Sequence, residues 1–247
     1  MESLIKKLRH QWEGLANADP FWAILTNPEK KGRKWKEDDF FQTGEIEIDN
    51  LIDELNKKKI FFIKGSAIDF GCGVGRLTQP MGKYFESVLG IDISEKMVKL
   101  AEENNNSPNC KFITNQTSHL GNIKDKSVDF IYSNIVLQHI YPPLVFEYLN
   151  EFERVVKRNG ILVFQLPDRF INRFLDLIRN NPLSQKWFYR MYLKVKFGSK
   201  PKMETYRIRK EKVINYLEKK NISLISLDDN RNAGPKWISY TYYCRKR

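Results

Sequence analysis

From Ile60 onward, short apolar runs alternate with segments of helical periodicity. The apolar runs are bounded by Gly, Asp, Asn or Ser and are short, which predicts strands. The segments between them place apolar residues three and four positions apart, which predicts amphipathic helices. Strands that alternate with helices favour right-handed crossovers and a mostly parallel sheet covered on both faces. The predicted strands are 66–70, 87–93, 110–114, 127–133 and 160–166, and the predicted helices are 76–84, 94–104 and 143–157.

The two ends of the chain depart from this alternation. Residues 1–58 lack strand patterning, and 45–56 has apolar residues near helical spacing, which predicts a helical N-terminal segment. Near the C-terminus, a predicted helix at 209–220 precedes two apolar runs, 222–228 and 237–245, which are joined by the turn-rich sequence DDNRNAGPK. This arrangement predicts an antiparallel pair of strands at the end of the sheet.

The composition fits a packed globular protein. Of the 247 residues, 41% are hydrophobic and 13% are aromatic, and the mean hydropathy is −0.53. No apolar stretch approaches the ~20 residues that a membrane-spanning helix requires, and the first residues contain no apolar core of signal-peptide length. The three cysteines, Cys72, Cys110 and Cys244, are too few and too scattered for a disulfide framework or a zinc cage. We therefore expect a reduced, cytoplasmic protein.

Basic residues are concentrated in one part of the chain. The formal net charge is +12, and the segment from Asp168 to Lys220, with fifteen basic and five acidic residues, carries +10 of it. Within this segment, 168–208 is longer than a strand-to-helix connection needs and interleaves aromatic with basic residues, so we expect a substrate cap there. The charge favours an anionic or aromatic substrate, a nucleic acid or a membrane surface, and a solvated lysine-rich face explains it equally well.

A glycine-rich loop directly after the first predicted strand gives the strongest chemical signal. The sequence AIDFGCGVGRL places Gly71, Gly73 and Gly75 in strict alternation after Asp69. Glycines at such a strand-to-helix junction allow a tight turn and let a ligand approach backbone N–H groups. A dinucleotide-binding loop, G-x-G-x-x-G, would have its third glycine where this chain has Arg76. The dinucleotide fingerprint is therefore absent, and a G-x-G-x-G loop stands in its place.

A carboxylate follows the second predicted strand. Asp92 stands near the end of the run SVLGIDI, where an acidic side chain can accept hydrogen bonds from both ribose hydroxyls of an adenosine. An aspartate in this place is also a common helix N-cap or turn residue. Ser94 is the better N-cap candidate for the next helix, which leaves Asp92 for a ligand.

With these features combined, the chain resembles the class I S-adenosylmethionine-dependent methyltransferases. The resemblance extends from about Ile60 to the C-terminus and rests on AIDFGCGVGRL, GIDIS, SVDFIYSNIVLQHI and EFERVVKRNGILVFQLP. It implies an α/β fold of the Rossmann-like, doubly wound type, in which a seven-stranded, mostly parallel sheet has an antiparallel last strand. We accordingly expect a methyltransferase domain over 59–247 and an N-terminal helical lid over 1–58.

The resemblance also implies which residues bind the cofactor, S-adenosylmethionine. Asp69 and the three loop glycines would face its methionine end, Arg76 would approach its carboxylate, and Asp92 would hold the ribose. After the third strand the family often has an aspartate near the adenine amino group; this chain has Asn-Gln-Thr there, and the glutamine can both donate and accept. The other expected cofactor contacts are Ile93, Met97, Gln116 and Thr117, together with Asn134 and Ile135 beneath the sulfonium methyl.

Candidate residues for the methyl acceptor follow the fourth predicted strand. His139, in the sequence LQHIYPP, is expected on the active-site side, and an unperturbed histidine pKa of about 6.5 suits a general base. Packing against the start of the next helix is the alternative role. Tyr141 and Gln138 are candidates for orienting the substrate. No acidic cluster has metal-ligand spacing, so no metal site is expected.

The N-terminal segment contains the sequence FFQTG, which in similar sequences belongs to a lid over the cofactor. Phe41 and Thr43 are its expected contacts, and an apolar lid would exclude water from the sulfonium. We predict an enzyme that transfers a methyl group from S-adenosylmethionine to an O or N atom of a small molecule, leaving S-adenosylhomocysteine. An RNA or nucleotide-bearing substrate is the alternative, and a non-catalytic cofactor-binding protein is a third hypothesis.

Overall fold

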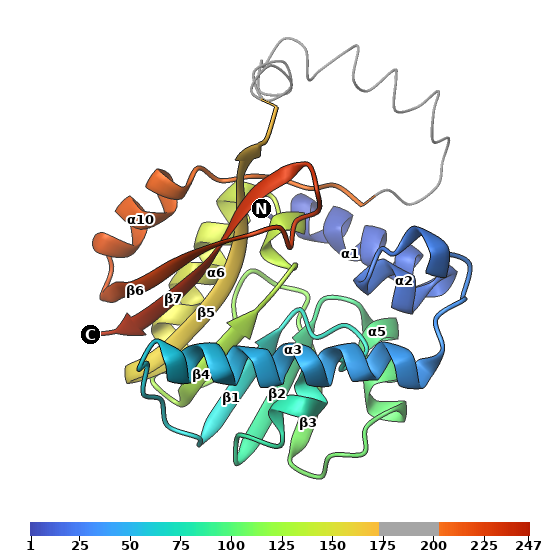
Figure 1. Cartoon of the computed structure of the whole chain (residues 1–247), viewed down its shortest axis with the longest axis horizontal. Coiled ribbons are helices and arrows are strands. Elements are labelled where there is room, and N and C mark those ends of the chain that lie inside the picture. The colour runs from blue at the N-terminus through green and yellow to red at the C-terminus, as the bar shows by residue number, and fades with distance from the viewer. Residues whose placement is uncertain (173–202) are drawn as a thin grey trace.

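The computed structural model describes residues 1–172 and 203–247. In these ranges one sheet of seven strands has the order β3-β2-β1-β4-β5-β7-β6, as Figure 1 shows. Each predicted strand is present. The strands are β1 (Ser66–Phe70), β2 (Ser87–Asp92), β3 (Cys110–Thr114), β4 (Val128–Ser133), β5 (Val156–Phe170), β6 (Ile222–Asn230) and β7 (Trp237–Lys246).

The strand directions follow the expected topology. β1 pairs in parallel with β2 and β4, and these pair in parallel with β3 and β5. β7 runs antiparallel to both of its neighbours, β5 and β6. The prediction of a doubly wound, mostly parallel sheet with an antiparallel last strand is therefore confirmed. Because the strand order reverses at β1 and β4, their carboxyl ends flank the crevice where such sheets bind ligands.

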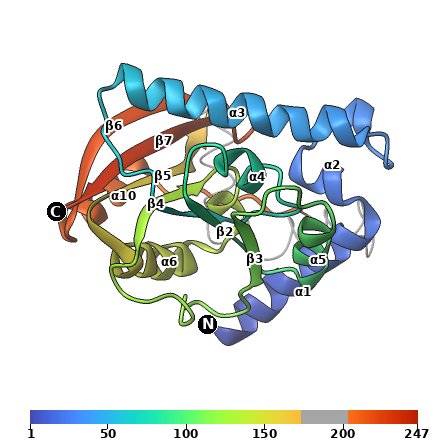
Figure 2. The same cartoon turned by 90° about the horizontal axis from the view of Figure 1, so that it is seen from below.

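Helices cover both faces of the sheet, and Figure 2 shows α3 and α6 on opposite sides of the strands. On one face, apolar side chains of α3, α4 and α5 pack in one cluster with those of the strands. On the other face, α6, α10 and the start of α1 form a second cluster with the sheet. The helices are α1 (Glu2–Ala18), α2 (Pro20–Ile24), α3 (Glu37–Lys57), α4 (Thr78–Met81), α5 (Glu95–Glu103), α6 (Pro142–Val155) and α10 (Lys210–Glu218), with 3-10 turns at Pro28–Lys30 and Leu137–His139.

Local sequence explains where several helices begin. Ser94 caps α5, as predicted, because its side chain accepts a hydrogen bond from the backbone N–H of Met97 at 3.2 Å. α6 begins at Pro142, in a first turn where the missing proline N–H has no helical partner to lose. α3 has three acidic residues in its first turn, which favours the positive end of the helix dipole.

Two elements differ in length from the sequence predictions. α4 is shorter than the predicted 76–84, and its last residue is followed by Gly82. β5 continues to Phe170 rather than ending at 166, because it pairs with β7 along its length and Phe170 stacks on Trp237 with ring centroids 3.8 Å apart. The first residues of the expected cap therefore belong to a strand. Most of that cap, residues 173–202, lies outside the described residues.

The N-terminal helices share the core of the sheet. Ile5 and Leu8 of α1 belong to the same buried cluster as residues of β1 and α6, and four residues of α3 lie in the cluster on the opposite face. The predicted helical segment over 1–58 is thus packed closely against the sheet. Of the helices in the described ranges, none has the length and apolarity to span a membrane.

Candidate active site

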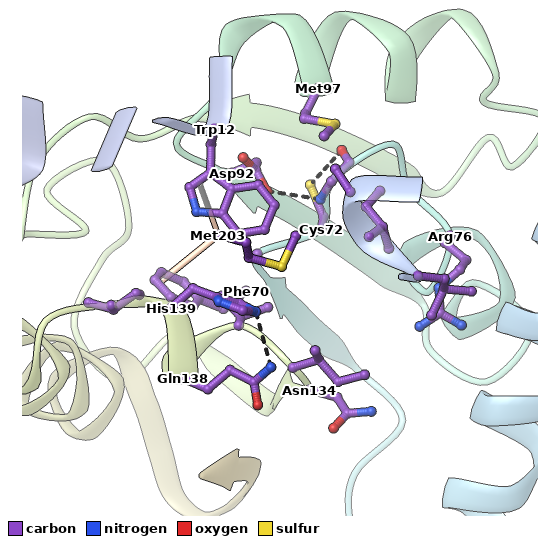
Figure 3. A pocket seen from close by; sticks show the side chains of 18 of the residues that line it. Trp12, Phe70, Cys72, Arg76, Asp92, Met97, Asn134, Gln138, His139 and Met203 are labelled. Atoms are coloured by element: carbon purple, nitrogen blue, oxygen red, sulfur yellow. Dashed lines mark hydrogen bonds between the residues drawn. The ribbon is translucent and has the colours of Figure 1, made fainter. Parts of the chain in front are cut away.

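A cavity of about 520 Å³ lies at the carboxyl ends of the central strands. It is within the ~300–1,000 Å³ that is typical of small-molecule sites. Side chains reach it from the glycine loop, the end of β2, the segment after β4, the N-terminal helices and the turn between β6 and β7. Figure 3 shows the side chains of 18 residues of its lining and labels ten of them, with Arg76 and His139 on opposite sides.

The glycine loop lines this cavity with bare backbone. Gly71 and Gly73 have φ of 84° and 53°, a region that favours glycine. A Cβ at Gly71 would lie 2.3 Å from the side chain of Val136, and one at Gly73 would lie 2.6 Å from Cδ1 of Ile24. The turn and the neighbours therefore both require glycine here. Gly75 also has a positive φ, of 83°, but it packs against β3 and does not line the cavity.

Asp92 lines the cavity at the end of β2. Its Oδ2 accepts a hydrogen bond from the backbone N–H of Gly73 and its Oδ1 accepts one from that of Ser94, each at 2.9 Å. Burial raises the pKa of Asp92, and these backbone N–H groups act in the opposite direction. Each carboxylate oxygen has two acceptor sites, so the side chain can accept further hydrogen bonds from a diol.

Asp69 lies beneath the glycine loop, not in the cavity lining. Its side chain is 1% exposed, and Thr78 Oγ1 donates a hydrogen bond to its Oδ2 at 2.6 Å. Burial raises the pKa of Asp69 to about 7. The expected direct contact of Asp69 with the cofactor thus has no counterpart in the cavity lining. Its hydrogen bond from Thr78 connects β1 to the start of α4 below the loop.

The segment after β4 enters the cavity in a strained conformation. Asn134, Ile135 and Val136 all line the cavity. Ile135 has a φ of 62°, which is unfavourable for a β-branched side chain. Strain of this kind, on the order of 1–3 kcal/mol, persists where the surrounding structure enforces it, and it is concentrated at functional sites. Both residues that the sequence predicted here therefore belong to the cavity.

Arg76 lines the side of the cavity opposite His139 and is 4% exposed. Its Nη2 forms an ion pair with Oε2 of Glu47 at 2.7 Å, and its Nη1 donates to Oγ1 of Thr43 at 3.3 Å. Glu47 belongs to α3 and was not among the predicted site residues. The sequence signal that could have identified it is its position one helical turn after Gly44 in the sequence FFQTGEIE.

Two residues after β3, Gln116 and Thr117, were predicted to contact the cofactor, but a third residue of this segment lines the cavity. Asn115 lines the cavity, together with Ile93 and Met97. Gln116 instead donates to Glu95 at 2.8 Å and accepts from Arg9 at 2.7 Å. The other predicted residue, Thr117, is exposed, and its hydroxyl donates to the backbone of the same loop. Of these three residues, Asn115 is therefore the one that the structure places in the cavity lining.

His139 is buried in the cavity wall. Its Nδ1 is 2.7 Å from the carbonyl oxygen of Glu204, and its Nε2 is 3.0 Å from Nε2 of Gln138. A carbonyl only accepts hydrogen bonds, so Nδ1 has the proton and Nε2 accepts one from the glutamine amide. Burial lowers the pKa of His139 to about 4, which keeps the ring neutral. Trp12 contacts the ring edge-to-face, with centroids 5.4 Å apart.

Tyr141 is 42% exposed and lies outside the cavity lining, where its ring contacts Tyr206. It is the residue directly before α6, at the N-cap position. Gln138, the other predicted orienting residue, does line the cavity and is 4% exposed. The structure therefore brings Gln138 and His139 together at the cavity and places Tyr141 elsewhere.

The N-terminal segment covers the cavity with other residues than the predicted Phe41 and Thr43. Neither of these lines the cavity: Phe41 packs against Phe40, and Thr43 contacts Arg76. Helix α3 presents Phe40 to the interior, which turns its neighbour away from the cavity. The residues of this segment that line the cavity, none of them among the predicted contacts, are Leu8, Trp12, Ala23, Ile24, Leu25, Thr26, Asn27 and Trp35.

Two further segments reach the cavity from the C-terminal part of the chain. Met203 and Thr205 precede α10, and Asn232, Ala233 and Gly234 form the turn between β6 and β7. Local sequence predicted a turn at the second of these places but gave no signal that it would reach the segment after β4, where Asn232 donates to Asn134. The antiparallel pairing of β7 with β5 brings this turn there. The segment before α10 is held by the backbone N–H of Tyr206, which donates to the carbonyl oxygen of Gln138 at 2.7 Å.

Comparisons with known proteins agree with this geometry. The sequence model of a methyltransferase domain family matches residues 68–164. An uncharacterised protein of Methanocaldococcus jannaschii is 29% identical over 153 residues, which are 62% of this chain and 67% of that protein. A ubiquinone biosynthesis O-methyltransferase of Pelagibacter ubique is 25% identical over 162 residues, 65% of this chain and 62% of that protein. A probable S-adenosylmethionine-dependent methyltransferase of Saccharomyces cerevisiae is 35% identical over 91 residues, 34% of this chain and 30% of that protein.

Solved structures share the fold. The magnesium protoporphyrin IX methyltransferase of Synechocystis, determined with bound S-adenosylhomocysteine, has a TM-score of 0.57 and 17% identity and covers 84% of this chain and 85% of its own. An S-adenosylmethionine-dependent methyltransferase of Mesorhizobium loti has a TM-score of 0.57 and 16% identity over 76% of this chain and 95% of its own. Residues 68–164 are thus a methyltransferase domain, and the fold is that of the S-adenosylmethionine-dependent methyltransferases.

The cavity of this methyltransferase fits the family's cofactor, S-adenosylmethionine. A Cβ on Gly71 or Gly73 would meet a neighbouring side chain, so only glycine gives this bare-backbone cradle. Asp92 has acceptor sites left for a ribose diol. Within the described ranges, Nε of the buried Arg76 has no hydrogen-bond partner, and a guanidinium matches a carboxylate such as that of the methionine end.

Proposed function

We propose that this methyltransferase transfers a methyl group from S-adenosylmethionine to an oxygen or nitrogen atom of a small molecule. The observation that carries the proposal is one cavity that the glycine loop and Asp92 line together with residues of the N-terminal helices. A cavity that holds both reactants fixes their approach, and correct placement alone can supply ~7–11 kcal/mol of the barrier reduction.

The cofactor side of the cavity has a partner for each part of the molecule. When bound, S-adenosylmethionine supplies a methyl group activated by the positive charge of its sulfonium. Asp92 would accept hydrogen bonds from the ribose hydroxyls, and Arg76 would bind the carboxylate at the methionine end. Asn115 would form a hydrogen bond with the adenine, beside Ile93 and Met97. These assignments are supported by the presence of all five residues in the cavity lining.

The acceptor side is lined by neutral polar side chains from three parts of the chain. Gln138 follows β4, Thr205 precedes α10, and Asn232 lies in the β6–β7 turn. Within the described ranges, the buried Oε1 of Gln138 has no hydrogen-bond partner. An acceptor molecule that carries an O–H or N–H group would satisfy it. The O-methyltransferase among the relatives supports the same class of acceptor.

His139 is the candidate for handling the acceptor's proton. Of its two ring nitrogens, Nε2 is the one without a proton, and it accepts a hydrogen bond from the side-chain amide of Gln138. To act as a base, His139 must exchange this hydrogen bond for one from the acceptor, while the carbonyl of Glu204 holds Nδ1. The ring is neutral and held in one tautomer, as this step requires, and its lowered pKa makes it a weaker base than an unperturbed histidine.

The experiment that tests the function uses S-adenosylmethionine labelled in its methyl group. The purified protein is incubated with the labelled cofactor and with fractionated cell extract, and mass spectrometry identifies what gains a methyl group and at which atom. The Asp92→Asn variant provides the background. We expect label in a small-molecule fraction on oxygen or nitrogen. Label confined to RNA, or to no fraction, would contradict the proposal.

A further inference from the structure

Glu47 connects helix α3 to two residues of the cavity lining. Its carboxylate accepts hydrogen bonds from Nη2 of Arg76 at 2.7 Å, from Nδ2 of Asn134 at 2.7 Å and from the hydroxyl of Tyr132 at 3.1 Å. Arg76 and Asn134 line the cavity, whereas Glu47 does not. Any effect of Glu47 on a ligand therefore passes through these two side chains.

The carboxylate determines how Asn134 is oriented. A carboxylate only accepts hydrogen bonds, so the amide of Asn134 must present its NH₂ group to Glu47. The amide oxygen then faces away, and Nδ2 of Asn232 donates to it at 3.3 Å. Glu47 thus makes Asn134 a hydrogen-bond acceptor on its side away from α3.

The same carboxylate compensates the charge of Arg76. A guanidinium that is 4% exposed is unfavourable without a nearby anion. Glu47 holds Nη2 and Thr43 holds Nη1, while Nε has no partner within the described ranges. The guanidinium is consequently fixed by α3 and keeps donor capacity, because it has five N–H groups.

A close approach of α3 to the glycine loop makes this arrangement possible. A Cβ on Gly44 would lie 2.0 Å from the carbonyl oxygen of Arg76, closer than any side chain tolerates. The missing side chain lets the helix lie directly against the loop. Glu47 follows one turn later on the same helix, where its carboxylate reaches both the loop and the end of β4.

We propose that Glu47 is a positioning residue that orients Arg76 and Asn134 for the amino-acid end of S-adenosylmethionine. This inference rests on the proposed function. The amino-acid end carries a carboxylate and an ammonium group. Arg76 supplies the matching cation, and the amide oxygen of Asn134 supplies an acceptor. The ribose is bound elsewhere, by Asp92, so the two ends of the cofactor depend on different residues.

Two ligands separate these contributions. S-adenosylhomocysteine contains the amino-acid end, and 5′-methylthioadenosine has the same nucleoside without it. Calorimetry on ligand-free protein measures both affinities in the wild type and in Glu47→Gln. We expect the variant to bind S-adenosylhomocysteine about tenfold or more weakly, the loss of a charged hydrogen-bond partner. Its affinity for 5′-methylthioadenosine should stay within about twofold, since the nucleoside contacts are unchanged.

Glu45→Gln is the matched control, because Glu45 lies on the same helix, is exposed and pairs with Lys83 at 3.1 Å. It should bind both ligands as the wild type does. Circular dichroism and thermal unfolding establish that each variant is folded. Glu47→Asp, which keeps the charge on a shorter side chain, is the second variant and should lose about threefold for S-adenosylhomocysteine alone.

The outcomes are distinct. Equal weakening of both ligands, as a merely structural role would give, or no weakening in either Glu47 variant overturns the positioning role. A wild-type protein that binds neither ligand overturns the proposed function itself. Selective loss of S-adenosylhomocysteine in the Glu47 variants, with Glu45→Gln unchanged, supports both.

Discussion

Under the proposed function, single residues divide the cavity into a nucleoside side and an amino-acid side. Asp92, at the end of β2, is oriented by two backbone N–H groups. Arg76 is oriented by the side chains of Glu47 and Thr43 on α3. The first arrangement is local to one strand and one loop, whereas the second depends on a helix that precedes the sheet in the chain. Substitutions on the two sides should therefore affect different ligands.

Replacing Asp92 by Asn tests the nucleoside side. The amide keeps the shape but removes the charge, so hydrogen bonds from the ribose lose about 1.5–3 kcal/mol. We expect S-adenosylhomocysteine and 5′-methylthioadenosine both to bind about 10–100-fold more weakly by calorimetry. Loss for only one of the two ligands would show that Asp92 does not bind the ribose that they share.

The buried His139 predicts how stability depends on pH. Its pKa is about 4 in the folded protein, below about 6.5 in the unfolded chain. Between these values the unfolded state binds a proton that the folded state does not, so wild-type stability falls as pH drops from 6.5 to 4. The loss attributable to this group approaches about 3 kcal/mol.

Denaturant unfolding of wild type and His139→Asn across this range measures that loss as the difference between the two proteins. The comparison is needed because Asp69 acts in the opposite direction. Its pKa is raised to about 7, so its contribution to stability falls as pH rises from about 3.9 to 7. A difference between the proteins that does not change with pH would contradict the buried, neutral state of His139.

Turnover measurements test the proposed role of His139 as the base that accepts the acceptor's proton. We expect His139→Ala to lower kcat at least ~tenfold, because positioned acid–base groups contribute ~10²–10⁴-fold and orienting groups less. Affinity for S-adenosylhomocysteine should be unchanged, since His139 lies on the side of the cavity opposite Arg76. Steady-state kinetics on the identified acceptor, together with calorimetry, measure the two effects. Unaltered turnover would show that His139 has no part in the reaction and only packs in the cavity wall.

Among the elements, helix α3 packs closely against the glycine loop. Its apolar side chains pack on the sheet, Gly44 meets the backbone of Arg76, and Glu47 reaches the end of β4. The helix therefore both stabilises the fold and completes the site. The apolar spacing predicted the helix over 45–56, but not its start at Glu37 or the contacts that its polar residues make.

Gly44→Ala tests this contact. The added Cβ would lie 2.0 Å from a backbone oxygen, so helix and loop must separate. We expect about 1–3 kcal/mol of lost stability in urea unfolding and weaker binding of S-adenosylhomocysteine. Gly121→Ala is the control, because a Cβ there has nothing within 4 Å. Equal behaviour of the two variants would contradict the close approach.

At the scale of the whole molecule, the cavity is assembled from segments far apart in the sequence. Residues of α1 and α2 cover the glycine loop, and the β6–β7 turn closes the side next to Asn134. α1 is held over the start of α5, where Oε1 of Glu13 accepts from the backbone N–H of Glu95 at 2.6 Å. A ligand in the cavity contacts all of these segments at once and should stabilise them together.

Hydrogen exchange with and without S-adenosylhomocysteine measures this coupling. A ligand present at 100 times its Kd stabilises the protein by about 2.7 kcal/mol. We expect slower exchange in residues 8–36 and 230–236, which line or flank the cavity. α10, none of whose residues lines the cavity, provides the internal control. Protection confined to the glycine loop would show that the N-terminal helices do not enclose the ligand.

Sequence patterns predicted a mostly parallel sheet, the succession of strands and helices along the chain, the glycine loop and the carboxylate at the end of β2. These features are local: strand runs, helical spacing and turn residues are encoded within a few neighbouring positions. The side chains at the ends of β1, β2 and β4 could be predicted as a group because carboxyl ends of parallel strands meet at one edge.

Tertiary packing selects the side chains that complete the site. Trp12, Met203 and Asn232 reach the cavity, and Glu47 reaches two residues that line it, because segments distant in sequence pack against the strand ends. The predicted Phe41 and Gln116 turn elsewhere because each element has one register against the sheet. A side chain's direction within an element is fixed by that packing, and packing joins residues that no local pattern connects.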